Sequence, residues 1–282
     1  MLGIIGGTGL YKLEGLSETE SVLAETPFGK PSSPILIGRM GKARLAFLAR
    51  HGHQHELLPS EINYRANIWA LKSVGVRRLI GVSAVGSLQP EIHPGDLVVP
   101  TQYLDFTKGR RASTFFGEGI VAHVSTANPT CPQLTGVLKT CAASADIPIS
   151  LGRTYACVEG PRLGTRAESE FLRLSKADLV GMTNVPEVFL AREAQLCYCT
   201  IAVVTDYDCW QEDPLQHVSV DQVLALYKKN IGKVQHLIIM ASQYDDKHPD
   251  CTCRKALANS ILTSENHLSQ EKRNLADFLK QS

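Results

Sequence analysis

The stretch Ile201-Ala202-Val203-Val204-Thr205-Asp206-Tyr207-Asp208 joins a near-continuous apolar run to two acidic residues. An apolar, β-branched run of this kind is typical of a strand that is buried on both faces of a sheet. Similar short runs occur at residues 4–5, 46–49, 78–82, 96–99 and 179–182. Amphipathic segments with helical spacing lie between several of them, at residues 60–73, 132–146, 167–176, 186–195 and 219–243. This alternation predicts an α/β fold, a single domain with a central mixed β-sheet flanked by helices on both faces.

The domain is expected to end near residue 244, because no repeat or break in composition precedes that point. A polar stretch from Asp245 to Asp250 follows, and a helical pattern runs from about Ser264 to Lys280. The predicted organisation is therefore one domain over residues 1–244. Residues 245–282 are expected to form a polar hinge and a C-terminal helix that packs on the same domain or on a neighbouring subunit.

Composition narrows the classes of partner. The chain has 282 residues, 29 Lys and Arg against 28 Asp and Glu, and a formal net charge of +1. It has no basic surplus for a nucleic-acid backbone and no excess charge typical of disorder. No apolar run reaches the length of about 18 residues that a membrane helix needs, and no leader pattern follows Met1. We expect a cytoplasmic protein whose partners are small molecules or further copies of the chain.

The eight cysteines lack the CxxC spacing of common metal sites. Cys131, Cys141, Cys157, Cys197, Cys199 and Cys209 are scattered, and we expect most of them to be small buried apolar residues. Cys251 and Cys253 lie in the polar stretch one residue apart, a spacing that makes the pair alone a poor metal site. Disulfides to other cysteines are the alternative for these two residues.

Ligands of doubly wound sheets bind beyond the carboxyl ends of the strands. The residues directly after the predicted strands are Gly6-Gly7-Thr8-Gly9, Arg50-His51-Gly52-His53, Ser83-Ala84-Val85-Gly86, Thr183-Asn184 and Asp206-Tyr207-Asp208. They are small, polar and mixed in charge, which makes them the candidates for function.

Several of these residues suit an anion. The loop around Thr8 is neither a dinucleotide fingerprint nor a Walker loop, and it is either a tight strand exit or an anion cradle of N–H groups and one hydroxyl. Arg50 can give a phosphate a bidentate contact, and His51 can donate beside it. Ser83 adds a hydroxyl but lacks the spacing of a nucleophile elbow.

The alternate histidines His51, His53 and His55 allow a competing hypothesis, a metal-dependent hydrolase. That hypothesis needs remote ligands such as Asp206 or His217. The apolar runs are too few and too unevenly spaced for an eightfold barrel, which disfavours it.

Asp206 and Asp208 are two carboxylates at i and i+2 after a strand, so they can point to one side. Like charges held close together raise one pKa. A carboxyl group that stays protonated near neutral pH can donate to a ring nitrogen while its partner accepts from an amine. A solvated acidic turn is the alternative interpretation.

The sequence resembles the 5′-methylthioadenosine phosphorylase family of the purine nucleoside phosphorylase superfamily. The resemblance covers the chain to about residue 240 and rests on seven segments in order, residues 4–9, 26–32, 49–52, 63–71, 159–162, 182–187 and 205–210. The C-terminal tail lies outside it, although Cys251-Thr252-Cys253 looks like the CxC of archaeal members.

The resemblance implies phosphorolysis, in which inorganic phosphate attacks C1′ of the ribosyl group as adenine leaves. It implies no cofactor and no metal, with phosphate as a co-substrate. By position, the resemblance assigns phosphate binding to Thr8, Arg50, His51, Ser83, Ala84 and Thr183. Met182 would lie against the ribose, and Asp206, the catalytic residue, would read the base together with Asp208.

The same resemblance implies an apolar pocket for the 5′-methylthio group, formed by Val220, Val223 and Leu224. It also implies that His123 reaches in from a neighbouring subunit, so that the enzyme is a homotrimer or a hexamer built from two trimers. Without the resemblance, these residues read as an ordinary helix core and a surface histidine.

Three positions, Leu163, Gly164 and Gly181, depart from the animal members, and Leu163 and Gly181 look more like bacterial phosphorylases of methylthioinosine or 6-oxopurine nucleosides. Together with Val220 they are the candidate specificity residues. Because Asp206 and Asp208 would touch the atoms that distinguish the bases, they favour adenine. A 6-oxopurine nucleoside is the alternative substrate. With this family resemblance, the competing hypothesis of the three histidines becomes a metal-dependent nucleoside hydrolase or deaminase.

Overall fold

The computed structural model describes residues 1–7, 10, 15–211, 220–244 and 250–281, and within 220–223 it describes the helix but not the side chains. The strands are β1 (Leu2–Gly6), β2 (Ser17–Val22), β3 (Ile35–Met40), β4 (Ala43–Ala49), β5 (Arg78–Ser87), β6 (Leu97–Phe106), β7 (Ile149–Val158), β8 (Leu179–Gly181) and β9 (Cys197–Asp206). The α-helices are α1 (Tyr64–Ser73), α2 (Pro132–Ser144), α3 (Arg166–Leu174), α4 (Asn184–Glu193), α5 (Val220–Gln243) and α6 (Gln270–Lys280).

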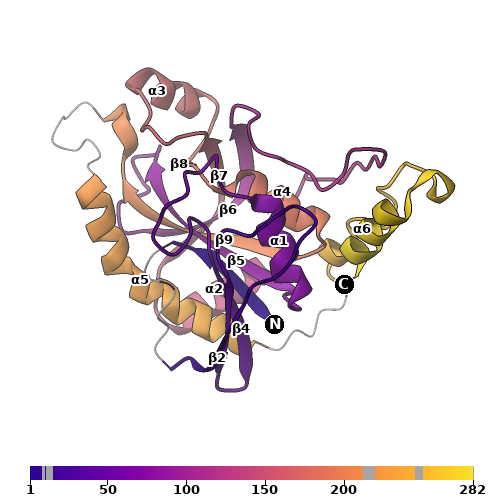
Figure 1. The fold of residues 1–282 in the computed structure, drawn as a ribbon. Helices are drawn as coiled ribbons and strands as arrows, with labels where there is room; N and C mark the ends of the chain where they lie inside the picture. The colour runs from indigo at the N-terminus through magenta and orange to yellow at the C-terminus, as the bar shows by residue number, and fades with distance from the viewer. Residues whose placement is uncertain (8–9, 11–14, 212–219, 245–249, 282) are drawn as a thin grey trace.

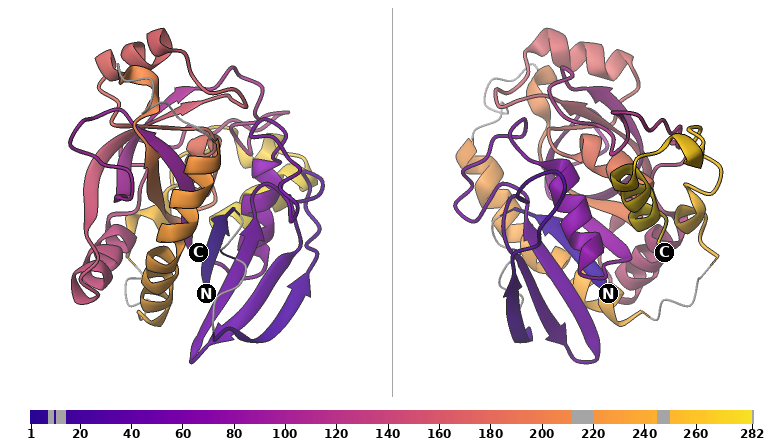
Figure 2. Two further views of the ribbon diagram at one scale, coloured as in Figure 1. Left: turned by 90° about the vertical axis from the view of Figure 1, so that its left-hand side faces the viewer. Right: turned by 45° about the vertical axis from the view of Figure 1, so that its right-hand side comes forward.

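The strands form one mixed sheet in the order β2-β3-β4-β1-β5-β8-β7-β6-β9, with a further pairing between β5 and β9. That pairing closes the strands β5, β8, β7, β6 and β9 into a ring. β5 is parallel to both β1 and β9, so their carboxyl ends meet at one edge. Figure 2 shows β2, β3 and β4 extending at one end of the molecule and α3 lying at the opposite end.

Two apolar layers cover the two faces of the sheet, as the alternation of side chains along a strand requires. Ile5 belongs to a layer with Trp69 of α1 and Val188 of α4. Its neighbour Ile4 belongs to the other layer, with Leu138 of α2 and Leu237 of α5. Figure 1 shows α5 on one side of the sheet and α1, α4 and α6 on the other. The predicted fold class, a mixed sheet with helices on both faces, is confirmed.

The predicted elements need three local corrections. α1 begins after Asn63, whose side chain accepts from the Ala66 N–H, and not after Ser60. Three strands were not predicted. β2 is exposed and polar, the first half of β7 is only partly buried, and the apolar run of β3 is interrupted by Gly38 and the exposed Arg39. The last helix begins at Gln270 rather than near Ser264, because Ser269 caps it.

The C-terminal segment packs against the same chain. Phe278 of α6 stacks on Trp69 of α1 with ring centroids 3.9 Å apart. Residues before α6 pair with the loop that carries His123: Ala122 bridges Ile261, and the His123 N–H donates to the Ser260 carbonyl at 2.9 Å. The predicted hinge includes residues 245–249, which lie outside the described residues.

None of the helices that the structure describes has both the length and the apolar character needed to cross a membrane.

Candidate functional site

Predicted phosphate-binding residues from three separate segments meet at the carboxyl end of the sheet. Ser83 lies within β5, and its Oγ is 3.3 Å from Oγ1 of Thr183, which precedes α4. The Thr183 hydroxyl makes no helix-capping hydrogen bond and lies within hydrogen-bond distance of the Ser83 hydroxyl instead. Arg50 follows β4, and its Nη1 donates to the carbonyl of Val82, the residue before Ser83, at 2.8 Å. Ala84 is exposed beside them. The structure thus brings four of the six predicted residues, Arg50, Ser83, Ala84 and Thr183, to one edge.

The Arg50 guanidinium is held more firmly than the sequence suggested. Its Nε and Nη2 donate to the two carboxylate oxygens of Glu187 at 2.7 and 2.8 Å. Nη2 also donates to the Ile5 carbonyl at 3.3 Å. The side chains of Arg50 and Glu187 are only 2% and 1% exposed. Four hydrogen bonds therefore use most of the five guanidinium N–H groups, and at most one N–H is left for an anion. The expected bidentate contact of Arg50 is made with Glu187.

His51 has a fixed ring nitrogen. Its Nδ1 lies 2.9 Å from the Leu57 carbonyl oxygen, which can only accept, so Nδ1 carries a proton. Burial and the neighbouring Arg50 lower the pKa of His51 to about 4. The ring is therefore neutral near pH 7, and Nε2 is an acceptor. The sequence predicted that His51 donates to phosphate, whereas in this tautomer the free Nε2 can only accept a hydrogen bond.

We expect the His51 ring to stay neutral, with its proton on Nδ1, in a protein sample at pH 6. The physical reason is that burial disfavours the charged imidazolium, which lowers the pKa of His51 to about 4. Two-dimensional NMR correlation of the ring nitrogens and carbon-bound protons measures both the charge and the tautomer. A cationic ring at pH 6, or a neutral ring protonated on Nε2, contradicts this assignment.

The two acidic side chains after β9 do not face bulk water. Asp208 is buried and Asp206 is half-buried. Asp206 accepts from the Thr205 hydroxyl and from the Asp208 N–H, each at 2.8 Å. Burial raises the pKa of Asp206, and the nearby negative charge of Asp208 raises it further. Burial also raises the pKa of Asp208. A raised pKa increases the protonated fraction near neutrality, as a proton donor to a base requires.

Neighbouring groups fix the position of this acid pair. Gly86 of β5 lies opposite Asp206 of β9, and a Cβ at Gly86 would meet Oδ1 of Asp206 at 2.8 Å. The indole N–H of Trp210 donates to the Ser87 carbonyl at 2.8 Å, which ties the turn after β9 to β5. Asp208 adopts a φ of +52°, a strained conformation of the kind that clusters at functional sites.

Gly181 makes room for a buried tyrosine. A Cβ on Gly181 would lie 1.9 Å from the Tyr155 hydroxyl oxygen, which is 3.4 Å from Oγ of Ser83. Tyr155 therefore occupies the space that a side chain at position 181 would need. The predicted ribose contact Met182 follows directly, and its sulfur lies 2.4 Å from where a Cβ on Gly160 would stand. Gly160 thus leaves space for the Met182 side chain, as Gly181 does for Tyr155.

We expect Gly181→Ala to lower the free energy of unfolding by about 1–3 kcal/mol, the usual cost of overpacking a core. Displacement of Tyr155 should also disturb Ser83 and raise the KM for phosphate. Urea denaturation and steady-state kinetics measure the two effects. Gly136→Ala in α2 is the matched control, because nothing lies within 4 Å of a Cβ there. Equal stability of the two variants argues against the tight contact.

Of the remaining predicted site residues, some lie outside the described residues, some are exposed, and one lies near the acid pair. Thr8 and the side chains of Val220 and Val223 lie outside the described residues. Leu224 is 46% exposed and Leu163 is 49% exposed. Gly164 lies beside the acid pair, because its carbonyl accepts from the Cys209 thiol at 3.4 Å. His123 is exposed on the loop that the C-terminal segment holds.

Arg111 was not predicted from the sequence, although it ties together the main chain on both sides of Met182. This buried guanidinium donates to the carbonyls of Met182 and Val185, both at 2.7 Å, and to the Glu159 carbonyl at 2.9 Å. It thereby connects the segments on both sides of the predicted ribose contact. Nothing in the local sequence signals this role, because these three carbonyls, like the Glu159 carboxylate that Nε reaches at 3.4 Å, belong to residues far along the chain.

The proposed metal site of the three histidines is not supported by the described residues. Within them, the group of ligand side chains close enough for a metal does not include His51, His53 or His55. The rings of His51 and His55 instead stack with centroids 4.5 Å apart.

A mixed sheet with this edge of hydroxyl, guanidinium and carboxyl groups has counterparts among known proteins. The family model described as "Phosphorylase superfamily" matches residues 1–239, and the chain belongs to that superfamily. The S-methyl-5′-thioadenosine phosphorylase of Geobacter sulfurreducens is 45% identical over 279 residues, which are 99% of this chain and 97% of the relative. The protein of the same name from Hyperthermus butylicus is 48% identical and covers 93% of this chain and 95% of its own.

Solved structures agree with these relatives. The crystal structure of a methylthioadenosine phosphorylase from an antarctic soil metagenomic library has a TM-score of 0.92 and 45% identity, covering 99% of this chain and 98% of its own. The methylthioadenosine phosphorylase of Schistosoma mansoni in complex with adenine has a TM-score of 0.86 and 36% identity, covering 93% of this chain and 98% of its own.

Proposed function

We propose that this chain catalyses the reversible phosphorolysis of S-methyl-5′-thioadenosine, giving adenine and 5-methylthioribose 1-phosphate in methionine and purine salvage. The observation that carries the proposal is the pair Asp206 and Asp208, buried or half-buried at the sheet edge that also holds Ser83 and Thr183. The relatives and solved structures named above support it, since they match nearly the whole chain.

The hydroxyl end of the proposed site, at Ser83, and its acid end, at Asp206, are far enough apart to leave room for a ribosyl group. Ser83 and Gly86 are three residues apart on β5, and Gly86 pairs with Asp206. At about 3.3 Å per residue, the hydroxyl end and the acid end are separated by roughly 10 Å of strand. In the proposed complex the ribosyl group lies between them, against Met182.

The chemistry needs charge stabilisation at both ends. A phosphate oxygen forms a bond to C1′ from one side as the bond from C1′ to N9 of adenine breaks on the other, which inverts C1′. Positive charge develops on the sugar in the transition state, and the bound phosphate stabilises it. Asp206, with its raised pKa, donates a proton to N7 so that adenine leaves neutral. Phosphate is the only other reactant in this proposal, with no further cofactor.

Release of adenine from methylthioadenosine, measured with and without phosphate, tests the proposal. Phosphate-dependent release that yields 5-methylthioribose 1-phosphate is the expected result. Release without phosphate, giving the free sugar, indicates a hydrolase instead. Faster turnover of methylthioinosine or a 6-oxopurine nucleoside shifts the assignment to the alternative substrate, which the glycine at 181 keeps open.

We further propose a cytoplasmic homotrimer, or a hexamer of two trimers, in which His123 completes the site of a neighbouring subunit. The exposure of His123 and its anchored main chain support this arrangement. Light scattering measures the oligomeric mass. A monomer with full activity would contradict the proposal.

A further inference from the structure

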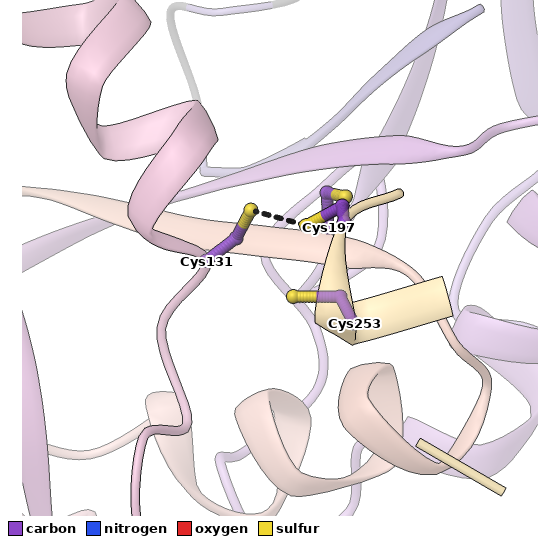
Figure 3. Close-up of side chains that lie close together, drawn as sticks. Cys131, Cys197 and Cys253 are labelled. Atoms are coloured by element: carbon purple, nitrogen blue, oxygen red, sulfur yellow. Dashed lines mark hydrogen bonds between the residues drawn. The ribbon is translucent and has the colours of Figure 1, made fainter. Parts of the chain in front are cut away.

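Four cysteines from three distant parts of the chain lie together in the apolar layer under α2 and α5. Cys131 precedes α2, Cys197 begins β9, and Cys251 and Cys253 belong to the C-terminal segment. Their four sulfur atoms all lie within 4.8 Å of one another, and all four residues are buried. Figure 3 shows Cys131, Cys197 and Cys253 directed toward one another. The burial of Cys131 and Cys197 agrees with the prediction that most of the scattered cysteines are buried, but their gathering with Cys251 and Cys253 was not predicted.

The spacing fits a tetrahedral metal site. Zinc binds four thiolates at about 2.3 Å in a tetrahedron, which puts the sulfurs about 3.8 Å apart. The Cys131 and Cys251 sulfurs are 3.6 Å apart. Each sulfur is close to all three others, whereas two disulfides would draw them into pairs at about 2.05 Å. The sequence had made Cys251 and Cys253 a poor metal site as a pair and left disulfides to other cysteines as the alternative, because it could not place Cys131 and Cys197 beside them.

The surroundings suit anionic sulfur. Nη1 of Arg192 donates to the Cys253 sulfur at 3.1 Å, and the Leu134 N–H donates to the Cys131 sulfur at 3.4 Å. Such outer contacts orient ligands and offset their charge in metal sites. The main chain is also fixed at two of the ligands, because the Cys131 N–H donates to the Tyr198 carbonyl at 2.7 Å and the Cys197 N–H donates to the Arg77 carbonyl at 3.0 Å.

We propose that Cys131, Cys197, Cys251 and Cys253 form a structural site for one zinc ion per chain, which clamps the C-terminal segment onto the domain. Four Zn–S bonds form and the thiols that are protonated release their protons, with no change of oxidation state. The site is separate from the sheet edge where phosphorolysis is proposed, and the inference does not depend on that function.

Metal analysis of the full-length protein, purified with a reductant and without added chelator, tests the proposal. We expect close to one zinc per chain, and at least a tenfold loss of zinc in Cys131→Ala and in Cys253→Ala. Cys141→Ala is the matched control and should keep its zinc, because Cys141 is buried in the same apolar layer but lies outside the cluster.

A second measurement uses the wild-type protein and so avoids variants that fail to fold. Metal-free protein, prepared by chelation under reducing conditions, should bind Co²⁺ and show the visible absorption of a tetrahedral thiolate complex, which ZnCl₂ should remove. Removal of zinc should also speed tryptic cleavage after Arg254 or Lys255 at least tenfold. Reduced wild-type protein that holds no zinc and takes up no Co²⁺ overturns the proposal, as do disulfides among these cysteines in the freshly isolated protein.

Discussion

Asp206→Asn is expected to lower kcat/KM for methylthioadenosine by about 10²–10³-fold, within the range that loss of a general acid costs. The amide keeps the shape of the carboxyl group and can still donate a hydrogen bond, but it cannot transfer a proton to N7. The loss with methylthioinosine should be much smaller, because an amide suits an oxo base. Steady-state kinetics with both nucleosides at saturating phosphate measure the difference.

The control for this variant is Asp105→Asn in β6. Asp105 is exposed and accepts from the main chain and hydroxyl of its neighbour Thr107, so the kinetics of this variant should match those of the wild type. Equal losses on the two nucleosides in Asp206→Asn would separate Asp206 from recognition of the base, and the proposed role of the acid pair would then be wrong.

Glu187→Gln is expected to lower the free energy of unfolding by about 3–5 kcal/mol, because it leaves the buried charge of Arg50 without its counter-ion. For a chain of this size, that corresponds to a fall in Tm of roughly 6–20 °C. Without Glu187 the guanidinium of Arg50 is no longer held in place. The KM for phosphate should therefore rise more than the KM for the nucleoside. Chemical denaturation and two-substrate kinetics measure both effects.

Glu20→Gln provides the matched comparison, since it breaks an ion pair with Arg44 in which the side chains are 59% and 52% exposed. An exposed pair contributes at most about 1 kcal/mol. If both variants unfold alike, the buried pair is not the anchor of Arg50 described above. If only stability falls and the phosphate KM is unchanged, Arg50 has no role in anion binding.

The parts of the fold that the sequence predicted are those decided by local pattern. The apolar runs near residues 4, 46, 80, 98, 180 and 202 all lie in strands, and α2 and α5 occupy their predicted ranges to within a few residues. β2 could not be found in this way, because its side chains are exposed and polar and only pairing with β3 makes it a strand.

The site was predictable as a set of residue types at strand ends, but not in its geometry. Arg50 could be named from its position after a strand, yet its partner Glu187 is 137 residues away and no spacing rule connects them. The same holds for Tyr155, whose closeness to Gly181 depends on the pairing of β7 with β8. The four cysteines were visible one by one, and only the folded chain assembles them.

The attachment of the tail to the loop of His123 couples neighbouring subunits in the proposed oligomer. Ala122 bridges Ile261 and the His123 N–H donates to the Ser260 carbonyl, so the position of this loop depends on the C-terminal segment of its own chain. Loosening that segment in one protomer would therefore displace His123 from the proposed site of the next.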